Sequence, residues 1–284
     1  STKENIKDYD IFEADFKNLL KHSLDFVIIA SPSTFHLNHS EPFLKAGIPI
    51  FIEKPIAASA KDATALLQLI ERYQSRVAVG YCLRFLPSAI KAKEIVQKKI
   101  LGSIYNIEIH AGSYLPNWRP DIHYKDSVSA SRSLGGGALL ELSHELDYYQ
   151  WIFGNLILDE CYLRSSSELN LEVEDVVDII GRDSINNSPV HIHLDFLQKE
   201  PTRHLKVLGS KGEMEWDISA NLVRVKGEKS LQFDYNNYIY EQMYADELIA
   251  FSNCDESLIA SASESIDTII LIEKIKKTGI YLNG

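Results

Sequence analysis

DFVIIASPS (residues 25–33) and IPIFIEKP (48–55) decide the fold of this chain. Each is a short, unbroken apolar run that closes at a proline, and RVAVGY (76–81) is a third apolar run. Such runs are typical of strands buried on both faces, as in a parallel sheet. Residues 34–46 and 58–74 lie between them and carry apolar residues at helical spacing. Strands alternating with helices predict right-handed crossovers and a doubly wound, Rossmann-like parallel sheet.

The pattern changes after about residue 102. Residues 104–111 alternate between apolar and polar, as in a strand with one wet face, and residues 134–153 begin with glycines and continue as one long helix. Further alternating strands and two closing helices follow, at 158–166, 174–182, 188–197, 203–210, 212–219, 240–252 and 262–278. We therefore predict a Rossmann-like domain over 1–101. An α+β domain with a large, open-faced, mostly antiparallel sheet is predicted over 102–284.

Composition excludes several classes of function. The chain has 284 residues with a net charge of -11, which would repel phosphate backbones and anionic lipid. Its three cysteines form no CxxC pair, so a disulfide framework or zinc site is not expected. No apolar run reaches the roughly 20 residues of a membrane helix, and the polar N-terminus does not resemble a signal peptide. We expect a cytoplasmic protein that binds neither nucleic acid nor membrane.

A motif that usually opens a nucleotide-binding sheet does not occur in the sequence. Such sheets normally start with a strand, a G-x-G-x-x-G turn and a helix. The only glycine cluster here, Gly135 to Gly137, follows no buried strand. We expect that the first strand and helix, roughly 30 residues or more, are missing from this chain.

Two polar motifs follow the predicted parallel strands. Glu53-Lys54-Pro55 lies at the carboxyl end of one strand, the edge of an α/β sheet where ligands bind, so Lys54 can shuttle a proton. A surface lysine that caps a strand is the alternative. Arg84 follows the next strand and can clamp an anion or pair with Glu53, or simply lie on a loop.

The glycine-led stretch GGGALLELSHELD (135–147) is the richest in chemistry. Glu141, His144 and Asp147 are spaced three apart, which predicts that they share one helix face. His144 can accept a hydroxyl proton while a carboxylate orients its ring. A solvated polar face is the alternative. The glycines favour the functional interpretation because they indicate a close backbone approach.

Together, these motifs resemble the Gfo/Idh/MocA family of oxidoreductases over nearly the whole chain. The resemblance rests on order and spacing: ASPSTFH (30–36), EKP (53–55), GYCLRF (80–85), the glycine-led stretch with its histidine, and GSKGEMEWD (209–217). It implies a Rossmann domain joined to an open-faced sheet. NAD or NADP and a sugar-type substrate would bind between them.

The resemblance also implies roles for single residues. Lys54 matches the family's catalytic lysine and His144 its catalytic histidine, with Glu141 as the carboxylate beside it and Pro55 often after a cis peptide bond. The residues implied to line the cofactor or hold the substrate are Ser31, Pro32, His36, Glu53, Lys54, Pro55, Arg84, Asp147 and His144.

Three departures from the family pattern leave questions open. Glu141 stands one residue closer to His144 than usual, so the acid that partners His144 is undecided. Cys82 stands where asparagine is common. Trp118 and Arg119, in the stretch 114–120, either contact an anionic sugar substrate or belong to a structural loop.

A metal site is considered and not predicted. His191, His193 and Asp195 alternate on one predicted strand and so share a face. We interpret them as a wet sheet face and expect no metal.

The predicted function is an NAD(P)-dependent oxidoreductase that transfers hydride to or from a sugar, nucleotide sugar or cyclitol. The alternative is a truncated, non-catalytic relative that binds a sugar or serves in assembly. In either case the open sheet suggests a homodimer or homotetramer.

Overall fold

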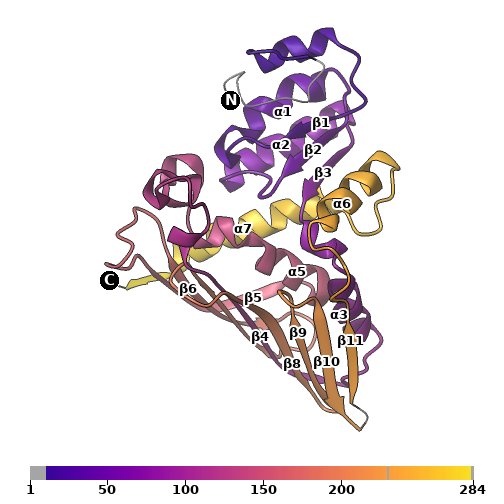
Figure 1. The fold of residues 1–284 in the computed structure, drawn as a ribbon, viewed down its shortest axis with the longest axis vertical. Coiled ribbons are helices and arrows are strands. Elements are labelled where there is room, and N and C mark those ends of the chain that lie inside the picture. The colour runs from indigo at the N-terminus through magenta and orange to yellow at the C-terminus, as the bar shows by residue number, and fades with distance from the viewer. Residues whose placement is uncertain (1–10, 229, 283–284) are drawn as a thin grey trace.

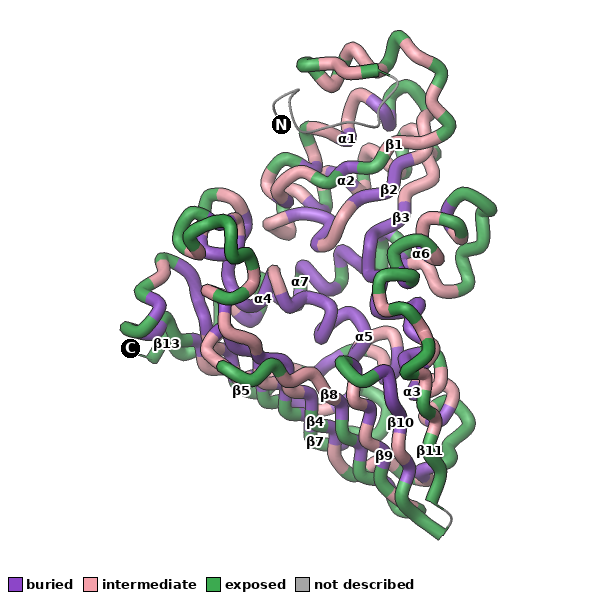
Figure 2. The backbone as a smooth tube through the Cα atoms, in the orientation of Figure 1, coloured by how far each residue is buried: buried purple, intermediate pink, exposed green. Residues whose placement is uncertain are grey.

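The computed structural model describes residues 11–228 and 230–282, and two sheets form its framework. In Figure 1 the smaller sheet lies at the top with α1 (His36–Lys45) and α2 (Ala60–Tyr73), and the large sheet forms the base. Helices α5 (Ser143–Phe153) and α7 (Ala262–Thr278) lie between the sheets, and Figure 2 shows that buried residues are concentrated along them. A Rossmann-like sheet followed by a mixed, largely antiparallel sheet is the predicted fold class, which is confirmed.

The small sheet has the strand order β1-β2-β3-β12. Its first three strands are parallel, with Val27 opposite Ile50 and Ile50 opposite Val77. They are the three apolar runs of the sequence, and their connections carry the helices that cover them. The strands and helices are β1 (Val27–Ile29), α1 (His36–Lys45), β2 (Ile50–Glu53), α2 (Ala60–Tyr73) and β3 (Val77–Gly80).

The large sheet has nine strands in the order β11-β10-β9-β8-β4-β7-β6-β5-β13. Most neighbours are antiparallel, but β4 pairs parallel to β7 and β13 parallel to β5. Its strands are β4 (Ile104–Gly112), β5 (Leu156–Arg164), β6 (Val176–Asp183), β7 (Pro189–Asp195), β8 (Thr202–Gly209), β9 (Gly212–Asp217), β10 (Leu222–Gly227), β11 (Leu231–Asp234) and β13 (Ile280–Leu282).

One face of this sheet is apolar and covered, and the other is polar. On β8, Leu205 and Val207 are buried, while His204 and Lys206, which alternate with them, lie on the opposite face. On β4 the same alternation buries Ile107 and Ile109. The helices α3 (Pro87–Gln97), α5 (Ser143–Phe153) and α7 (Ala262–Thr278) lie on the apolar side. The polar face is the open one.

The predicted helix over 134–153 is wrong in one respect. It is two helices, α4 (Ala138–Glu141) and α5, because Leu142 leaves helical geometry with φ -96° and ψ 32°. Glu141 therefore ends one helix while His144 and Asp147 lie on the next. The prediction that these three residues share one helix face is not met. Near the start of the described chain, Phe16–Lys21 form a 3₁₀ helix.

Segments from the C-terminal half return to the small sheet. β12 (Ala260–Ser261) pairs antiparallel with β3. On α6 (Gln242–Ser252), the Phe251 ring packs edge-on against Phe51 of β2, with centroids 5.7 Å apart. In the other direction, α3 packs on the large sheet, where Trp216 donates a 2.8 Å hydrogen bond to Ser88. The boundary at 101/102 remains a prediction. Segments on each side of it pack against the other sheet: β12 pairs with the small sheet, and α3 packs on the large one.

Membrane insertion finds no support in the helices that the structure describes, since none of them is long and apolar enough to cross a bilayer.

Candidate active site

Lys54 lies at the carboxyl end of β2, directly after Glu53. Its Nζ donates a 2.8 Å hydrogen bond to the backbone oxygen of Glu141 and lies 3.9 Å from the Glu141 carboxylate. The Lys54–Pro55 peptide is cis, as the family resemblance implied. The Lys54 side chain is one-fifth exposed. The ammonium is thus fixed between the small sheet and α4 and keeps access to the hollow between them.

His36 joins the loops that follow β1 and β2 at this edge of the small sheet. Its Nε2 lies 2.7 Å from the Ser31 carbonyl oxygen, and its Nδ1 lies 3.0 Å from that of Pro55. The ring is buried, and burial lowers the pKa of His36. His36 therefore holds the loops in which Ser31, Pro32, Lys54 and Pro55 lie, and both of its ring nitrogens are engaged with the backbone.

His144 lies near the start of α5, in a pocket against Tyr81. The two rings meet edge to face with centroids 5.5 Å apart, and His144 is only 8% exposed. Burial, then the positive charges of Arg203 and Lys54, hold the pKa of His144 well below its usual value. The imidazole is therefore neutral near pH 7. Its Nδ1 makes no hydrogen bond with any residue that the structure describes.

The carboxylates near His144 are engaged elsewhere. Glu145 is fully buried and forms a two-point ion pair with Arg203, at 2.6 Å and 3.1 Å. Glu141 lies beside Lys54. The open question of which acid partners His144 thus has an answer within the described residues: no carboxylate hydrogen bonds to it. The charge of Arg203 acts on His144 instead.

Arg203 is a site residue that the sequence analysis missed. It opens β8 and lines a cavity of about 330 Å³, which is also lined by Ala111, Gly112, Ser113, Leu142, Pro201, Thr202, Ser219 and Tyr240. The signal was present, because Arg203 alternates in phase with the apolar Leu205 and Val207. An arginine in phase with core residues points toward the covered face.

Arg84 and Asp147 pair with each other away from Lys54. Two hydrogen bonds, of 2.9 Å and 2.7 Å, join them, and both side chains are 2% exposed. Glu264 adds a contact at 3.3 Å. The suggested pairing of Arg84 with Glu53 is therefore wrong. The structure does not bring Arg84 and Asp147 to the hollow beside His144, because each neutralises the buried charge of the other.

Trp118 and Arg119 are held by protein contacts. The Trp118 indole donates a 2.8 Å hydrogen bond to Ser113 and packs edge-on against Phe196. Arg119 is exposed, and its guanidinium lies 3.3 Å from the Ser129 hydroxyl. Of the two interpretations left open, these contacts fit the structural loop, although Ser113 also lines the cavity beside Arg203.

The three glycines before α4 allow a close approach between protein segments. A Cβ on Gly135 would lie 2.3 Å from the Ser33 hydroxyl, and one on Gly136 would lie 2.5 Å from the Ser129 carbonyl oxygen. Gly137 has φ +107° and faces the Glu174 carboxylate. The close approach that the glycines predicted is thus made to the chain itself, and it fixes the start of α4 beside Lys54.

Replacing Gly137 with alanine is expected to lower the free energy of unfolding by about 2 kcal/mol or more, because the new Cβ needs a positive φ and meets Glu174. Urea unfolding measures this change. Gly47→Ala is the matched control, since Gly47 also has a positive φ but no atom within 4 Å of the added Cβ. Equal losses in the two variants would contradict the role of the Glu174 contact.

Glu53, at the end of β2, and Glu247, on α6, interact as an acidic pair. Glu247 of α6 is 3% exposed, and burial, with the nearby Glu53 charge, raises its pKa to about 9. Burial also raises the pKa of Glu53, against the opposing charge of Lys54. At neutral pH Glu247 is therefore protonated, so of these two glutamates only Glu53 can carry a negative charge.

The pH dependence of stability follows from Glu247. The folded chain keeps a proton that the unfolded chain releases above its ordinary pKa of 4.5, so the free energy of unfolding falls as pH rises from 4.5 toward about 9. Glu247→Gln is expected to be more stable than the parent by an amount that grows across this range to about 2 kcal/mol or more. Urea midpoints at pH 6, 7.5 and 9 test it. Glu256→Gln, in an exposed loop, is the control, and parallel curves for Glu247→Gln and the parent would count against the assignment.

The polar face of the large sheet gathers histidines. His110 and His193 lie on neighbouring strands with ring centroids 4.8 Å apart, and Asp195 lies beside them. The three residues that the sequence offered as metal ligands, His191, His193 and Asp195, do not form one cluster. His191 lies 3.0 Å from Asp178 instead, and His110 takes its place.

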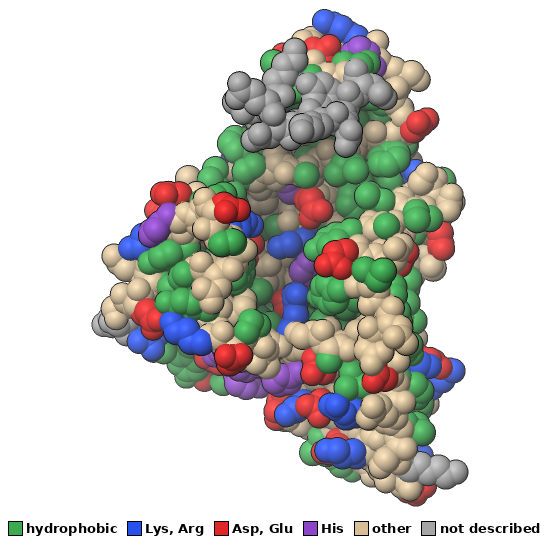
Figure 3. All heavy atoms as spheres, in the orientation of Figure 1, with side chains coloured by type: hydrophobic (Ala, Val, Ile, Leu, Met, Phe, Trp, Pro, Cys, Tyr) green, Lys and Arg blue, Asp and Glu red, His purple; other side chains and the backbone are tan. Residues whose placement is uncertain are grey.

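Figure 3 shows the candidate active site as a hollow between the two sheets, with lysine or arginine, histidine and acidic side chains at its floor. Lys54 enters from the small sheet, His144 from α5 and Arg203 from β8. The arrangement offers a fixed ammonium, a neutral imidazole and a guanidinium. Such a set suits a proton transfer at a polar, oxygen-rich substrate.

Comparison with known protein families identifies the class of protein to which this chain belongs. Residues 3–81 match the model of an oxidoreductase family with an NAD-binding Rossmann fold, and residues 89–215 match the Gfo/Idh/MocA C-terminal domain. The chain belongs to the Gfo/Idh/MocA family of oxidoreductases.

Relatives and solved structures agree with this assignment. The rhizopine catabolism protein MocA of Rhizobium meliloti is 28% identical over 132 residues, 46% of this chain and 38% of the relative. A levoglucosan dehydrogenase in complex with NADH and levoglucosan superposes with a TM-score of 0.83 at 15% identity, over 94% of this chain and 81% of that one. An inositol dehydrogenase homologue with NAD+ from Azotobacter vinelandii gives 0.80 at 13% identity, over 94% and 82%. The matches to curated relatives span roughly a third to a half of those proteins' length.

Proposed function

We propose that this chain is an NAD(P)-dependent oxidoreductase that acts on a hydroxyl of a sugar, nucleotide sugar or cyclitol. The observation that carries the proposal is the hydrogen bond from Lys54, at the end of β2, to the Glu141 backbone oxygen, three residues before His144. The charge of Lys54 contributes to the lowered pKa of His144, so the two groups are electrostatically coupled. Names of relatives that include levoglucosan and inositol dehydrogenases support the substrate class.

The residues at the small-sheet edge fit the nicotinamide half of such a cofactor. Parallel strands β1 and β2 end at loops that His36 holds together, and the half-buried Glu53 offers carboxylate oxygens that accept hydrogen bonds from ribose hydroxyls. Ser31, Pro32 and Pro55 would line the same edge. When bound, the nicotinamide supplies the acceptor or donor of hydride.

The chain's own residues would handle the proton. Lys54 Nζ orients the substrate hydroxyl and holds the charge that develops on its oxygen, and neutral His144 accepts the proton in the oxidising direction. Arg203 lines the adjacent cavity, where it binds further substrate oxygens. The surrounding Tyr81 and Leu142 limit access of water.

We also propose that the chain forms a homo-oligomer through its large sheet and functions in the cytoplasm. The polar face of the large sheet is open and includes exposed apolar side chains such as Ile180 and Leu208, so self-association into a homodimer or homotetramer would cover them. The three cysteines are free, with Cys82 and Cys161 buried, which suits a reducing cytoplasm.

A non-catalytic relative that binds a sugar or serves in assembly is the second candidate. Calorimetric titration of the purified chain with NAD(H) and NADP(H) separates the two. Micromolar binding, followed by turnover in a screen of sugars and cyclitols, is expected for the enzyme. Absence of binding by all four nucleotides would contradict the proposed enzyme and leave the non-catalytic relative.

A further inference from the structure

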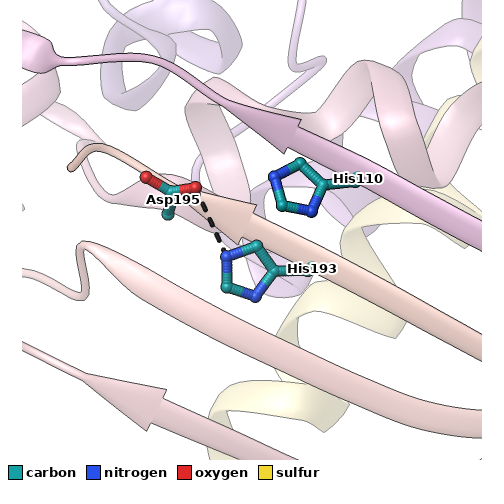
Figure 4. A group of neighbouring side chains, drawn as sticks. All are labelled: His110, His193 and Asp195. Carbon is teal, nitrogen blue, oxygen red and sulfur yellow. Dashed lines mark ion pairs between the residues drawn. The ribbon is translucent and has the colours of Figure 1, made fainter. Parts of the chain in front are cut away.

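A cluster of imidazoles and carboxylates lies on the open face of the large sheet, across the sheet from the candidate active site. β4 and β7 run side by side in parallel, with His110 opposite His193 and Gly112 opposite Asp195. Figure 4 shows the two rings and the carboxylate close together on these strands. One side-chain ligand atom from each of His110, His193 and Asp195 lies within 4.8 Å of the other two.

His193 is oriented by a carboxylate on the far side of its ring. Its Nδ1 lies 2.9 Å from Asp178 Oδ1, on the neighbouring strand β6. Its Nε2 lies 3.3 Å from Asp195 Oδ2. When Asp178 accepts a hydrogen bond from Nδ1, the lone pair of Nε2 points toward the cluster. A carboxylate behind a histidine is the usual support of a metal-bound imidazole.

Asp195 is also held in place. Its Oδ1 accepts hydrogen bonds from the backbone amides of Leu197 and Gln198, both of 2.7 Å, which leaves Oδ2 for the cluster. A Cβ on Gly112 would lie 2.1 Å from Asp195 Oδ2. The glycine therefore makes the space into which this carboxylate turns. Gln198 Oε1 in turn lies 2.7 Å from His110 Nε2 and steadies that ring.

We propose that His110, His193 and Asp195 bind a divalent transition-metal ion of the zinc type on the open face of the large sheet. Two imidazoles and one carboxylate suit Zn²⁺ and its neighbours, whereas Mg²⁺ and Ca²⁺ prefer all-oxygen sites. Tetrahedral ligands at about 2.0–2.1 Å from zinc lie about 3.3 Å from one another. The His193–Asp195 pair already has this spacing. His110 has to approach by up to about 1.5 Å, and the remaining coordination position would be taken by water.

Calorimetric titration of the chelator-treated protein with ZnCl₂ tests the site. One ion per chain is expected to bind with a dissociation constant in the micromolar range or tighter, and MgCl₂ is expected to give no binding. His193→Ala and Asp195→Asn should each weaken zinc binding at least about ten-fold, since each removes one of three ligands. Gly112→Ala should also weaken it by displacing the carboxylate. Asp178→Asn should weaken it by up to about ten- to a hundred-fold, as other supporting residues do.

His191→Ala is the matched control. His191 lies on the same strand and the same face, and it contacts the same Asp178, but it is outside the cluster. Its replacement should change the dissociation constant by less than about three-fold. Metal-free urea midpoints close to that of the parent confirm that the variants fold. Absence of saturable zinc binding, or an equal effect of His191→Ala and His193→Ala, would overturn the proposal.

Discussion

Replacing Lys54 with methionine is expected to reduce kcat by about 10²–10⁴-fold while the chain still folds. Methionine keeps the length and most of the apolar volume of the side chain but cannot donate to the Glu141 carbonyl or hold charge on a substrate oxygen. The measurement is steady-state oxidation of a sugar or cyclitol that the parent turns over. Cofactor binding is measured on the same samples, so that a lost site is distinguished from lost chemistry.

Lys61→Met is the control for this experiment, because Lys61 is an exposed lysine at the start of α2. It should keep the parent's kcat within about two-fold, as exposed substitutions usually do. If Lys54→Met retained near-parental turnover, the proposed role of Lys54 would be wrong even if the chain proved to be an enzyme.

Breaking the buried ion pair between Arg84 and Asp147 is expected to give the largest loss of stability. Asp147→Asn leaves the guanidinium buried with only the half-exposed Glu264 as partner, which should cost about 3–5 kcal/mol in the free energy of unfolding. Urea unfolding monitored by circular dichroism measures it. The double variant Arg84→Met with Asp147→Leu should recover much of the loss, because neither charge then remains buried.

Arg182 and Asp159 provide a matched comparison on the surface. They form the same two-point pair, at 2.8 Å and 2.7 Å, but both side chains are 40% exposed. Asp159→Asn should cost about 1 kcal/mol or less. Similar losses for the buried and exposed pairs would contradict the importance of burial at Arg84.

Much of the fold follows from local sequence patterns. The apolar runs that became β1, β2 and β3 have no polar residue at alternate positions, so they predict burial on both faces of a parallel sheet. The residues of β8 alternate between apolar and polar, which predicts that one face of this strand is covered and the other is open. The break at Leu142 could not be seen, because leucine is a good helix former and its local sequence carries no stop signal.

The candidate site was only partly predictable. Lys54 follows a buried strand, and that placement alone brings it to a ligand-binding edge. Arg84 has the same placement, yet its guanidinium turns to Asp147, 63 positions further along the chain. Pairing over such a separation depends on the tertiary fold, and the same holds for His110, which joins His193 only because β4 lies beside β7. Sequence spacing had put His191 in that place.

At the start of β8, the candidate active site and the open face of the large sheet are separated by a single strand. Arg203 points toward the helix that carries His144 and grips Glu145 on that helix. The next residue, His204, points the other way, and its ring stacks on His110 at 5.4 Å. A contact at His204 on the open face therefore lies one residue from Arg203, whose positive charge adds to the effect of burial in lowering the pKa of His144. A ligand in the hollow and a partner on the open face would thus contact neighbouring residues of the same strand, Arg203 and His204.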